Sequence, residues 1–132
     1  MEKFIEYLYS KFLLCESVSI DSRTASEGSL FFGLNGPNFN GSRYALDALD
    51  RGAFFAVIDE RHDFKDPRII YCEDTLKALQ SLATFHRSFY KNPLIALTGS
   101  NGKTTTKELM FRVLNKKYIT HATFGNLNNH IG

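Results

Sequence analysis

A glycine-rich segment, TGSNGKTT at residues 98–105, constrains the fold of this chain more than any other feature. It follows a short apolar run at 94–97, typical of a strand, and precedes a helical stretch at about 104–115. A second apolar run at 118–122 predicts another strand. Strand, glycine-rich turn, helix and strand form half of a nucleotide-binding α/β unit. Because a parallel sheet needs further strands, residues 92–132 are expected to begin a domain that this sequence does not complete.

The residue types in this segment are those that bind a polyphosphate. Glycines let backbone N–H groups approach phosphate oxygens closely, and the N-terminus of the following helix adds a partial positive charge of ~0.5. A lysine then holds the β- and γ-phosphates, and a neighbouring hydroxyl binds Mg²⁺. Gly102, Lys103 and Thr104 fit these roles in order.

The segment departs from the strict phosphate-loop pattern at one position. GxxxxGK[ST] requires a glycine where this chain has Leu97, so the match is the shorter GxxGK[ST]. The alternative is a structural strand-to-helix turn with an exposed lysine and a threonine cap. The apolar run before the segment and the helical stretch after it favour phosphate binding.

Residues 1–91 are predicted to form a separate α/β domain, with a boundary near 91. Hydrophobic periodicity predicts a helix at 2–13 and a second at 44–49, and Asp74 caps a third that ends before Pro93. In the third helix the inward side is predicted to hold Leu76, Leu79, Leu82, Ala83 and Phe89. Strands are predicted at 18–21, 29–34, 54–58 and 69–72, and a loop at 35–41. The run SLFFGL at 29–34 is apolar enough to be buried on both faces of a sheet.

Composition argues against several other classes of protein. A net charge of +2 with scattered basic residues does not favour nucleic-acid binding. No apolar run approaches the ~20 residues that span a bilayer, and the first residues resemble neither a signal peptide nor a basic anchor. Cys15 and Cys72 lack metal-binding spacing, so reduced, buried thiols are expected. These observations predict a soluble cytoplasmic protein with no membrane partner.

The glycine-rich segment and its surroundings resemble the Mur ligases. TGSNGKTTTKE at 98–108 is similar to the ATP loop of that family, which also lacks the first glycine of the strict pattern. Further similarity lies at 19–25, 28–36 and 48–57. Within the family, Lys107-Glu108 and TFGNLNNHIG at 123–132 resemble the branch that adds D-alanyl-D-alanine.

The resemblance implies an ATP-dependent ligase of peptidoglycan precursor synthesis. Such an enzyme joins D-alanyl-D-alanine to UDP-N-acetylmuramoyl-tripeptide through an acyl phosphate, with ATP and Mg²⁺. Residues 1–91 would form the UDP-sugar domain, and 92–132 would begin the central ATP-binding domain. The chain alone is expected to be inactive, because the rest of the ATP-binding domain and a third domain are missing from it.

The resemblance also assigns candidate site residues. Lys103 would act on the β- and γ-phosphates as the catalytic cation, and Thr104 would bind Mg²⁺. The expected ATP phosphate contacts are Gly99, Ser100, Asn101, Gly102, Lys103, Thr104 and Thr105. The expected UDP-substrate contacts are Ser22, Arg23, Asn40 and Gly41, and Asn126, Asn128 and Asn129 are assigned to the muramoyl-peptide region.

These assignments have plain structural alternatives. Asp21-Ser22-Arg23 also fits an Asx-type turn with a surface arginine, and the asparagines at 126–129 also fit a polar turn. Asn40 and Ser42 stand where relatives commonly carry an acid and a histidine, which weakens the assignment of that loop. For the whole protein, the alternatives are another Mur-type ligase or a non-catalytic ATP-binding module.

Overall fold

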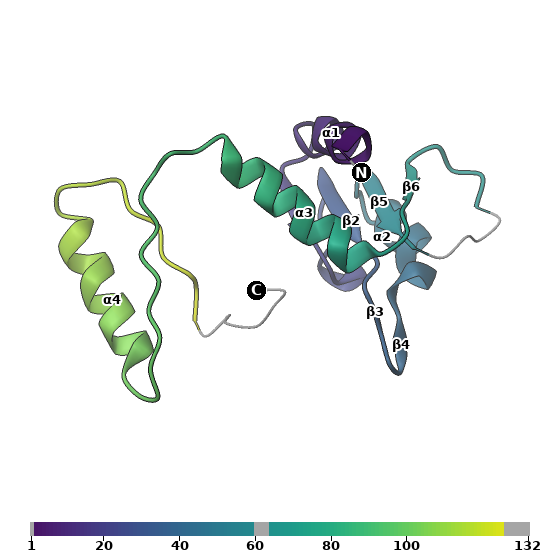
Figure 1. The fold of residues 1–132 in the computed structure, drawn as a ribbon. Coiled ribbons are helices and arrows are strands. Elements are labelled where there is room, and N and C mark those ends of the chain that lie inside the picture. Colours follow the sequence, from purple (N-terminus) through teal and green to yellow (C-terminus); the bar gives the residue numbers. More distant parts are fainter. Residues whose placement is uncertain (1, 60–63, 126–132) are drawn as a thin grey trace. The chain divides into compact units, whose positions relative to one another are not determined.

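The computed structural model describes residues 2–59 and 64–125 (Figure 1). The chain divides into two compact units, 1–90 and 91–132. The division lies next to the boundary expected from the sequence, where Asn92 and Pro93 follow the third helix.

The first unit is built on a four-stranded parallel sheet. Its strands are β1 (Ser17–Ser19), β2 (Ser29–Phe32), β5 (Phe55–Ile58) and β6 (Ile69–Tyr71), in the spatial order β1-β2-β5-β6. All four residues of the central strand β2 are buried. This confirms the prediction that the run is covered on both faces, as parallel sheets usually are.

Helices cover the two faces of this sheet. Helices α1 (Glu2–Phe12) and α3 (Thr75–Ser88) pack on one face, and the short α2 (Ala45–Asp50) packs on the other. Successive strand residues alternate between the two layers, as the period of a strand requires. The layer under α1 and α3 contains Leu30, Phe32, Val57 and Ile70. The layer under α2 contains Phe31, Ala56, Ile58 and Ile69.

The inward side of α3 differs in part from the prediction. Leu82 is buried as expected, but Ala83 and Phe89 are exposed, and Thr75 and Ala78 take inward positions. The Phe89 ring instead stacks on Tyr9 of α1, with ring centroids 5.2 Å apart. The aromatic residues at the end of α3 therefore pack against a helix rather than into the sheet.

The predicted loop at 35–41 contains a small hairpin. Strands β3 (Asn35–Gly36) and β4 (Phe39–Asn40) pair in antiparallel fashion, and the short 3-10 helix η2 (Gly41–Tyr44) follows them. A second 3-10 helix, η1 (Ser22–Thr24), lies after β1. Because β1, β2 and β5 are parallel, the segments that follow them gather at the same edge of the sheet. This carboxyl edge is where the candidate UDP-substrate residues lie.

The second unit contains one described helix, α4 (Lys103–Leu114). The strands expected at 94–97 and 118–122 are not formed, and this expectation was wrong for the described residues. A strand needs a hydrogen-bonding neighbour, and none of the residues in 91–125 supplies one. Apolar side chains that a sheet would bury are accordingly exposed, with Leu94 at 81% and Ile119 at 97%.

Candidate functional site

Two glycines shape the turn before α4. Gly99 has φ +149° and Gly102 has φ +75°, a conformation that other residues rarely adopt. A Cβ built on Gly102 meets no atom within 4 Å, so the backbone conformation rather than lack of space requires glycine there. Gly102 is the N-cap of α4, and its carbonyl oxygen accepts from the N–H of Thr106 at 2.9 Å. The loop thus ends at a helix N-terminus, which carries a partial positive charge.

The ammonium group of Lys103 lies back over this turn. Its Nζ donates to the carbonyl oxygen of Gly99 at 2.5 Å, and its side chain is half-buried. A cation is thereby held beside the backbone of the loop and close to the start of the helix. Cation and helix terminus favour the same kind of ligand, an anion with several oxygens.

An open hollow of about 600 Å³ lies against the loop. It is lined by the apolar run 94–97 on one side and by residues 100–105 on another. Thr123 and Gly125 complete the lining, and Lys107 holds them there by donating to both of their carbonyl oxygens. The residues predicted to contact phosphates, apart from Gly99, therefore share one concave surface.

The metal prediction rests on a single hydroxyl in this part of the chain. Thr104 lies in the first turn of α4 and lines the hollow. Across residues 2–59 and 64–125, no group of three or more His, Cys, Asp or Glu side chains gathers that could hold a metal ion. A hydroxyl together with phosphate oxygens is a donor set that suits Mg²⁺, which is usually bound through few protein groups. Thr104 fits that pattern as one ligand.

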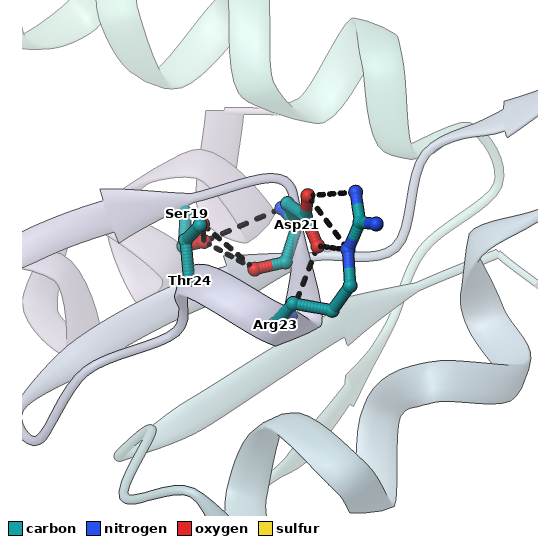
Figure 2. A network of polar contacts seen from close by, with 4 residues as sticks. All are labelled: Ser19, Asp21, Arg23 and Thr24. Carbon is teal, nitrogen blue, oxygen red and sulfur yellow. Dashed lines mark hydrogen bonds and ion pairs between the residues drawn. The ribbon is translucent and has the colours of Figure 1, made fainter.

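At the carboxyl edge of the sheet, Asp21 and Arg23 form a two-pronged ion pair (Figure 2). The guanidinium donates from Nε at 3.0 Å and from Nη2 at 2.7 Å, and the Arg23 backbone N–H donates to Oδ1 at 2.9 Å. These hydrogen bonds hold the pKa of the Asp21 carboxyl at about 2. Ser19 and Thr24 both donate to the Asp21 carbonyl oxygen and so brace the turn. The turn is Asx-type, as the structural alternative expected, and it also holds Arg23 in an exposed position.

Ser22 is buried, whereas the neighbouring Arg23 is exposed. Ser22 is only 6% exposed, and it is the largest cause of the lowered pKa of the Asp47 carboxyl in α2. The 3-10 helix η1, which contains Ser22, packs against α2.

Asn40 and Gly41 lie where the hairpin meets η2. The Gly41 N–H donates to the Leu34 carbonyl at 3.1 Å and lies 2.7 Å from Asn35 Oδ1. Beside it, the exposed rings of Phe39 and Tyr44 stack with centroids 5.6 Å apart.

Sequence reasoning missed Asp59, which directly follows β5. Its carboxylate accepts from the Asn35 side-chain amide at 2.5 Å and from the Ser42 hydroxyl at 3.1 Å. The Thr75 hydroxyl, at the start of α3, lies 3.2 Å from the other carboxylate oxygen. An acid directly after a buried central strand was the available signal, because such positions meet at the carboxyl edge of a parallel sheet.

Other predicted features carry no chemistry here or cannot be placed. Asn126, Asn128 and Asn129 lie outside the described residues. Burial raises the pKa of the Cys72 thiol to about 11 and also raises that of Cys15, which favours the protonated thiol at neutral pH. Within 2–59 and 64–125, no helix has the length and apolar character needed to cross a bilayer.

Comparison with known proteins gives a consistent result for both units. The family model for the Mur ligase family, catalytic domain, matches residues 15–87, and that for the Mur ligase middle domain matches 97–132. The UDP-N-acetylmuramoyl-tripeptide--D-alanyl-D-alanine ligase of Rickettsia prowazekii is 37% identical over 119 residues, covering 89% of this chain and 26% of that protein. The UDP-N-acetylmuramoyl-L-alanyl-D-glutamate--2,6-diaminopimelate ligase of Prochlorococcus marinus is 37% identical over 133 residues, covering 92% and 26%.

A solved structure agrees in fold. The MurF ligase from Thermotoga maritima in complex with ADP has a TM-score of 0.77 and 30% identity, covering 88% of this chain and 27% of that one. The chain thus spans about a quarter of the length of the relatives it matches. One family model covers more than half of the chain and a second covers most of the remainder. The chain belongs to the Mur ligase family.

Proposed function

We propose that this chain is the amino-terminal part of an ATP-dependent ligase that joins D-alanyl-D-alanine to UDP-N-acetylmuramoyl-tripeptide in peptidoglycan precursor synthesis. The observation that carries the proposal is the loop before α4, with Lys103 held over Gly99. It stands in a chain whose relatives include a UDP-N-acetylmuramoyl-tripeptide--D-alanyl-D-alanine ligase and a MurF ligase in complex with ADP. The nucleotide substrates of the proposed reaction support a cytoplasmic location.

In this proposal the loop binds the phosphates of ATP. Backbone N–H groups of residues 101–105 surround the phosphate oxygens, together with Gly99 and Ser100. On binding, Lys103 exchanges its bond to the Gly99 carbonyl for the β- and γ-phosphates. The ammonium group thereby neutralises charge that builds up as the γ-phosphoryl group is transferred, and charge neutralisation with positioning carries most of such a transfer.

The Thr104 hydroxyl is proposed as the one Mg²⁺ ligand that this part of the chain supplies. When bound, the ion would add positive charge at the phosphates. The remaining ligands would come from phosphate oxygens, water and protein beyond these residues, because the described residues hold no cluster of acidic or histidine ligands.

The chemistry that the loop serves is the activation of a carboxylate. The tripeptide carboxylate attacks the γ-phosphorus, the bond to the β-phosphate oxygen breaks, and an acyl phosphate and ADP form. The amine of D-alanyl-D-alanine then attacks the acyl carbon, and inorganic phosphate leaves as the amide bond and a released proton are formed. Phosphorylation is needed because an unactivated carboxylate is a poor acylating agent.

The carboxyl edge of the first unit is proposed to bind the uridine diphosphate of the sugar substrate. Arg23 supplies an exposed cation whose position is set by Asp21, and Asn40 and Gly41 lie at the neighbouring hairpin. Ser22 contributes through its backbone and through the shape of η1, because the residue is only 6% exposed. Asn126, Asn128 and Asn129 stay proposed contacts of the muramoyl-peptide region.

A second candidate activity is favoured by one observation. The diaminopimelate ligase of Prochlorococcus marinus is as identical to this chain as the Rickettsia enzyme is, at 37%. Such an enzyme would use the same loop and the same acyl-phosphate chemistry on a UDP-linked dipeptide.

Phosphate release by the complete protein distinguishes the two activities. We expect release with UDP-N-acetylmuramoyl-tripeptide plus D-alanyl-D-alanine, and background release with UDP-N-acetylmuramoyl-dipeptide plus diaminopimelate. The reverse pattern would assign the second activity, and release with neither pair would refute both.

A further inference from the structure

The Asp59 carboxylate joins three segments of the first unit. From the hairpin it accepts the Asn35 side-chain N–H at 2.5 Å, and from η2 it accepts the Ser42 hydroxyl at 3.1 Å. From α3, the backbone N–H of Thr75 donates to Oδ2 at 3.5 Å. The Thr75 hydroxyl lies 3.2 Å from Oδ2 and 3.2 Å from the Gly33 carbonyl oxygen, and its single proton goes to one of these two acceptors. These partners are 16 to 24 residues away in the sequence. One side chain therefore sets the spacing between β5, the hairpin and the start of α3.

The Asn35 side chain connects Asp59 to the backbone of Gly41. Its Nδ2 donates to Asp59, while its Oδ1 accepts from the Gly41 N–H at 2.7 Å. The amide can satisfy both neighbours in one orientation only, because a carboxylate accepts and a backbone N–H donates. The position of Gly41 is thus linked to the Asp59 carboxylate through one oriented side chain.

Asp59 lies outside both hydrophobic clusters of the unit. It is half-buried, and it faces donors only, with no cation among its hydrogen-bond partners in the described residues. Removing a carboxylate from water is costly, so this arrangement is a poor way to gain stability alone. It does fix the backbone of the hairpin and η2, where Asn40 and Gly41 lie.

We propose that Asp59 is a positioning residue for the UDP-sugar substrate, and that it acts by holding Asn35 and Ser42 so that the hairpin and η2 are formed before the substrate binds. This inference rests on the proposed function, which places the uridine diphosphate at the same edge. A preformed site binds more tightly because its loops are not ordered at the moment of binding.

A reciprocal exchange of side chains tests the link. In Asp59→Asn, the side chain has one oxygen and one NH₂ group, and hydrogen-bond donors lie on both sides of it. Whichever way the new amide turns, its NH₂ group faces donors where the wild type has an acceptor oxygen. In Asn35→Asp, two carboxylates face each other in place of the 2.5 Å hydrogen bond. In the double variant the partners can be complementary again: the new Asp accepts from Gly41 and from the NH₂ group of the new Asn, whose oxygen accepts from Thr75. The Ser42 hydroxyl, which donates to Asp59 Oδ1 in the wild type, then accepts the second N–H of that NH₂ group.

The measurement is the steady-state KM of the complete protein for UDP-N-acetylmuramoyl-tripeptide and for ATP. Each single variant is expected to raise the KM for the UDP substrate about tenfold, the effect of losing roughly one buried hydrogen bond, with the KM for ATP unchanged. The double variant is expected to restore most of the loss. Asp66→Asn is the matched control, since Asp66 is a hydrogen-bonded carboxylate that precedes β6 and so lies at the opposite edge. It should leave both KM values unchanged.

Four results would overturn the inference. One is an unchanged KM for the UDP substrate in both single variants. The second is a double variant no better than the poorer single variant. The third is an equal rise in the KM values for the UDP substrate and for ATP. The fourth is loss of the cooperative thermal transition in Asp59→Asn, which would make Asp59 a folding residue. A wild-type protein that does not use the UDP substrate would refute the proposed function, and the inference with it.

Discussion

Replacing Gly41 by alanine tests the close packing of the hairpin against the end of β2. A Cβ built on Gly41 lies 2.3 Å from the Leu34 carbonyl oxygen and 2.7 Å from the Gly33 carbonyl carbon. These are backbone atoms, so no side-chain rotation relieves the clash and the hairpin must shift. The shift also weakens the two hydrogen bonds that the Gly41 N–H makes. Overpacking of this kind costs about 1–3 kcal/mol and each weakened bond adds up to ~1 kcal/mol, so we expect the free energy of unfolding to fall by about 3 kcal/mol.

Thermal and urea unfolding of this chain, followed by circular dichroism, measures the effect. For a unit of this size, a loss of about 3 kcal/mol lowers Tm by roughly 12 °C or more. Gly36→Ala is the control in the same hairpin, because a Cβ there meets no atom within 4 Å. We expect that variant to differ from the wild type by less than about 1 kcal/mol. Equal unfolding midpoints for the two variants would refute the close approach of the Gly33 and Gly41 backbones.

Three further predictions concern the loop and the charges. Lys103→Ala and Lys103→Arg in the complete protein should both abolish ligation. Binding of the UDP substrate, measured by calorimetry, should stay nearly intact. More than a tenth of wild-type turnover in Lys103→Ala would contradict the assigned role. This 132-residue chain alone should bind Mg-ATP with millimolar or weaker affinity, on the order of −4 kcal/mol, because residues 91–125 form no paired sheet behind the loop. Micromolar binding in calorimetry would show that the loop is already preorganised. Hydrogen bonds from Arg23 lower the pKa of Asp21 to about 2, below its unfolded value of about 3.9. The ionised Asp21 carboxylate therefore stabilises the folded state above pH ~4, and this contribution is lost as the pH falls through 2. Asp21→Asn should therefore flatten the fall in Tm between pH 4 and 2, and an unchanged slope would argue against the ion pair.

The α/β layout of the first unit could be predicted because its signals are local. The run at 29–34 is apolar at consecutive positions, which indicates a strand covered on both sides, and β2 is buried throughout. Asp74 was predicted to cap the third helix, and its carboxylate accepts from the Lys77 N–H at 2.9 Å. Capping and burial of a central strand depend on neighbours within a few residues, so the sequence shows them directly.

The second unit shows where local signals fail. The runs at 94–97 and 118–122 have strand-like composition, but strand formation depends on a partner elsewhere in the chain. Residues 91–125 contain no such partner, so only the helix of the predicted unit forms. Its formation follows from local hydrogen bonds, which need no second segment.

The details of the site depended on contacts between distant residues. Ser22 could be selected from its motif, but its effect on the pKa of Asp47, 25 positions away, could not be predicted. Likewise, nothing near Asp59 indicates that Asn35, Ser42 and Thr75 converge on it. Residue types at the carboxyl edge were therefore predictable, whereas the directions in which their side chains point were not.

The central claim is that the loop of Lys103 serves the activation of a carboxylate through an acyl phosphate. Isotope transfer tests this directly: the complete protein is given ATP, D-alanyl-D-alanine and UDP-N-acetylmuramoyl-tripeptide labelled with ¹⁸O in its reacting carboxylate. In the proposed reaction the bridging carboxylate oxygen leaves with the phosphoryl group. We predict one ¹⁸O atom in each inorganic phosphate formed, measured by ³¹P NMR or mass spectrometry. Label found in AMP, or phosphate formed without label, would contradict the account.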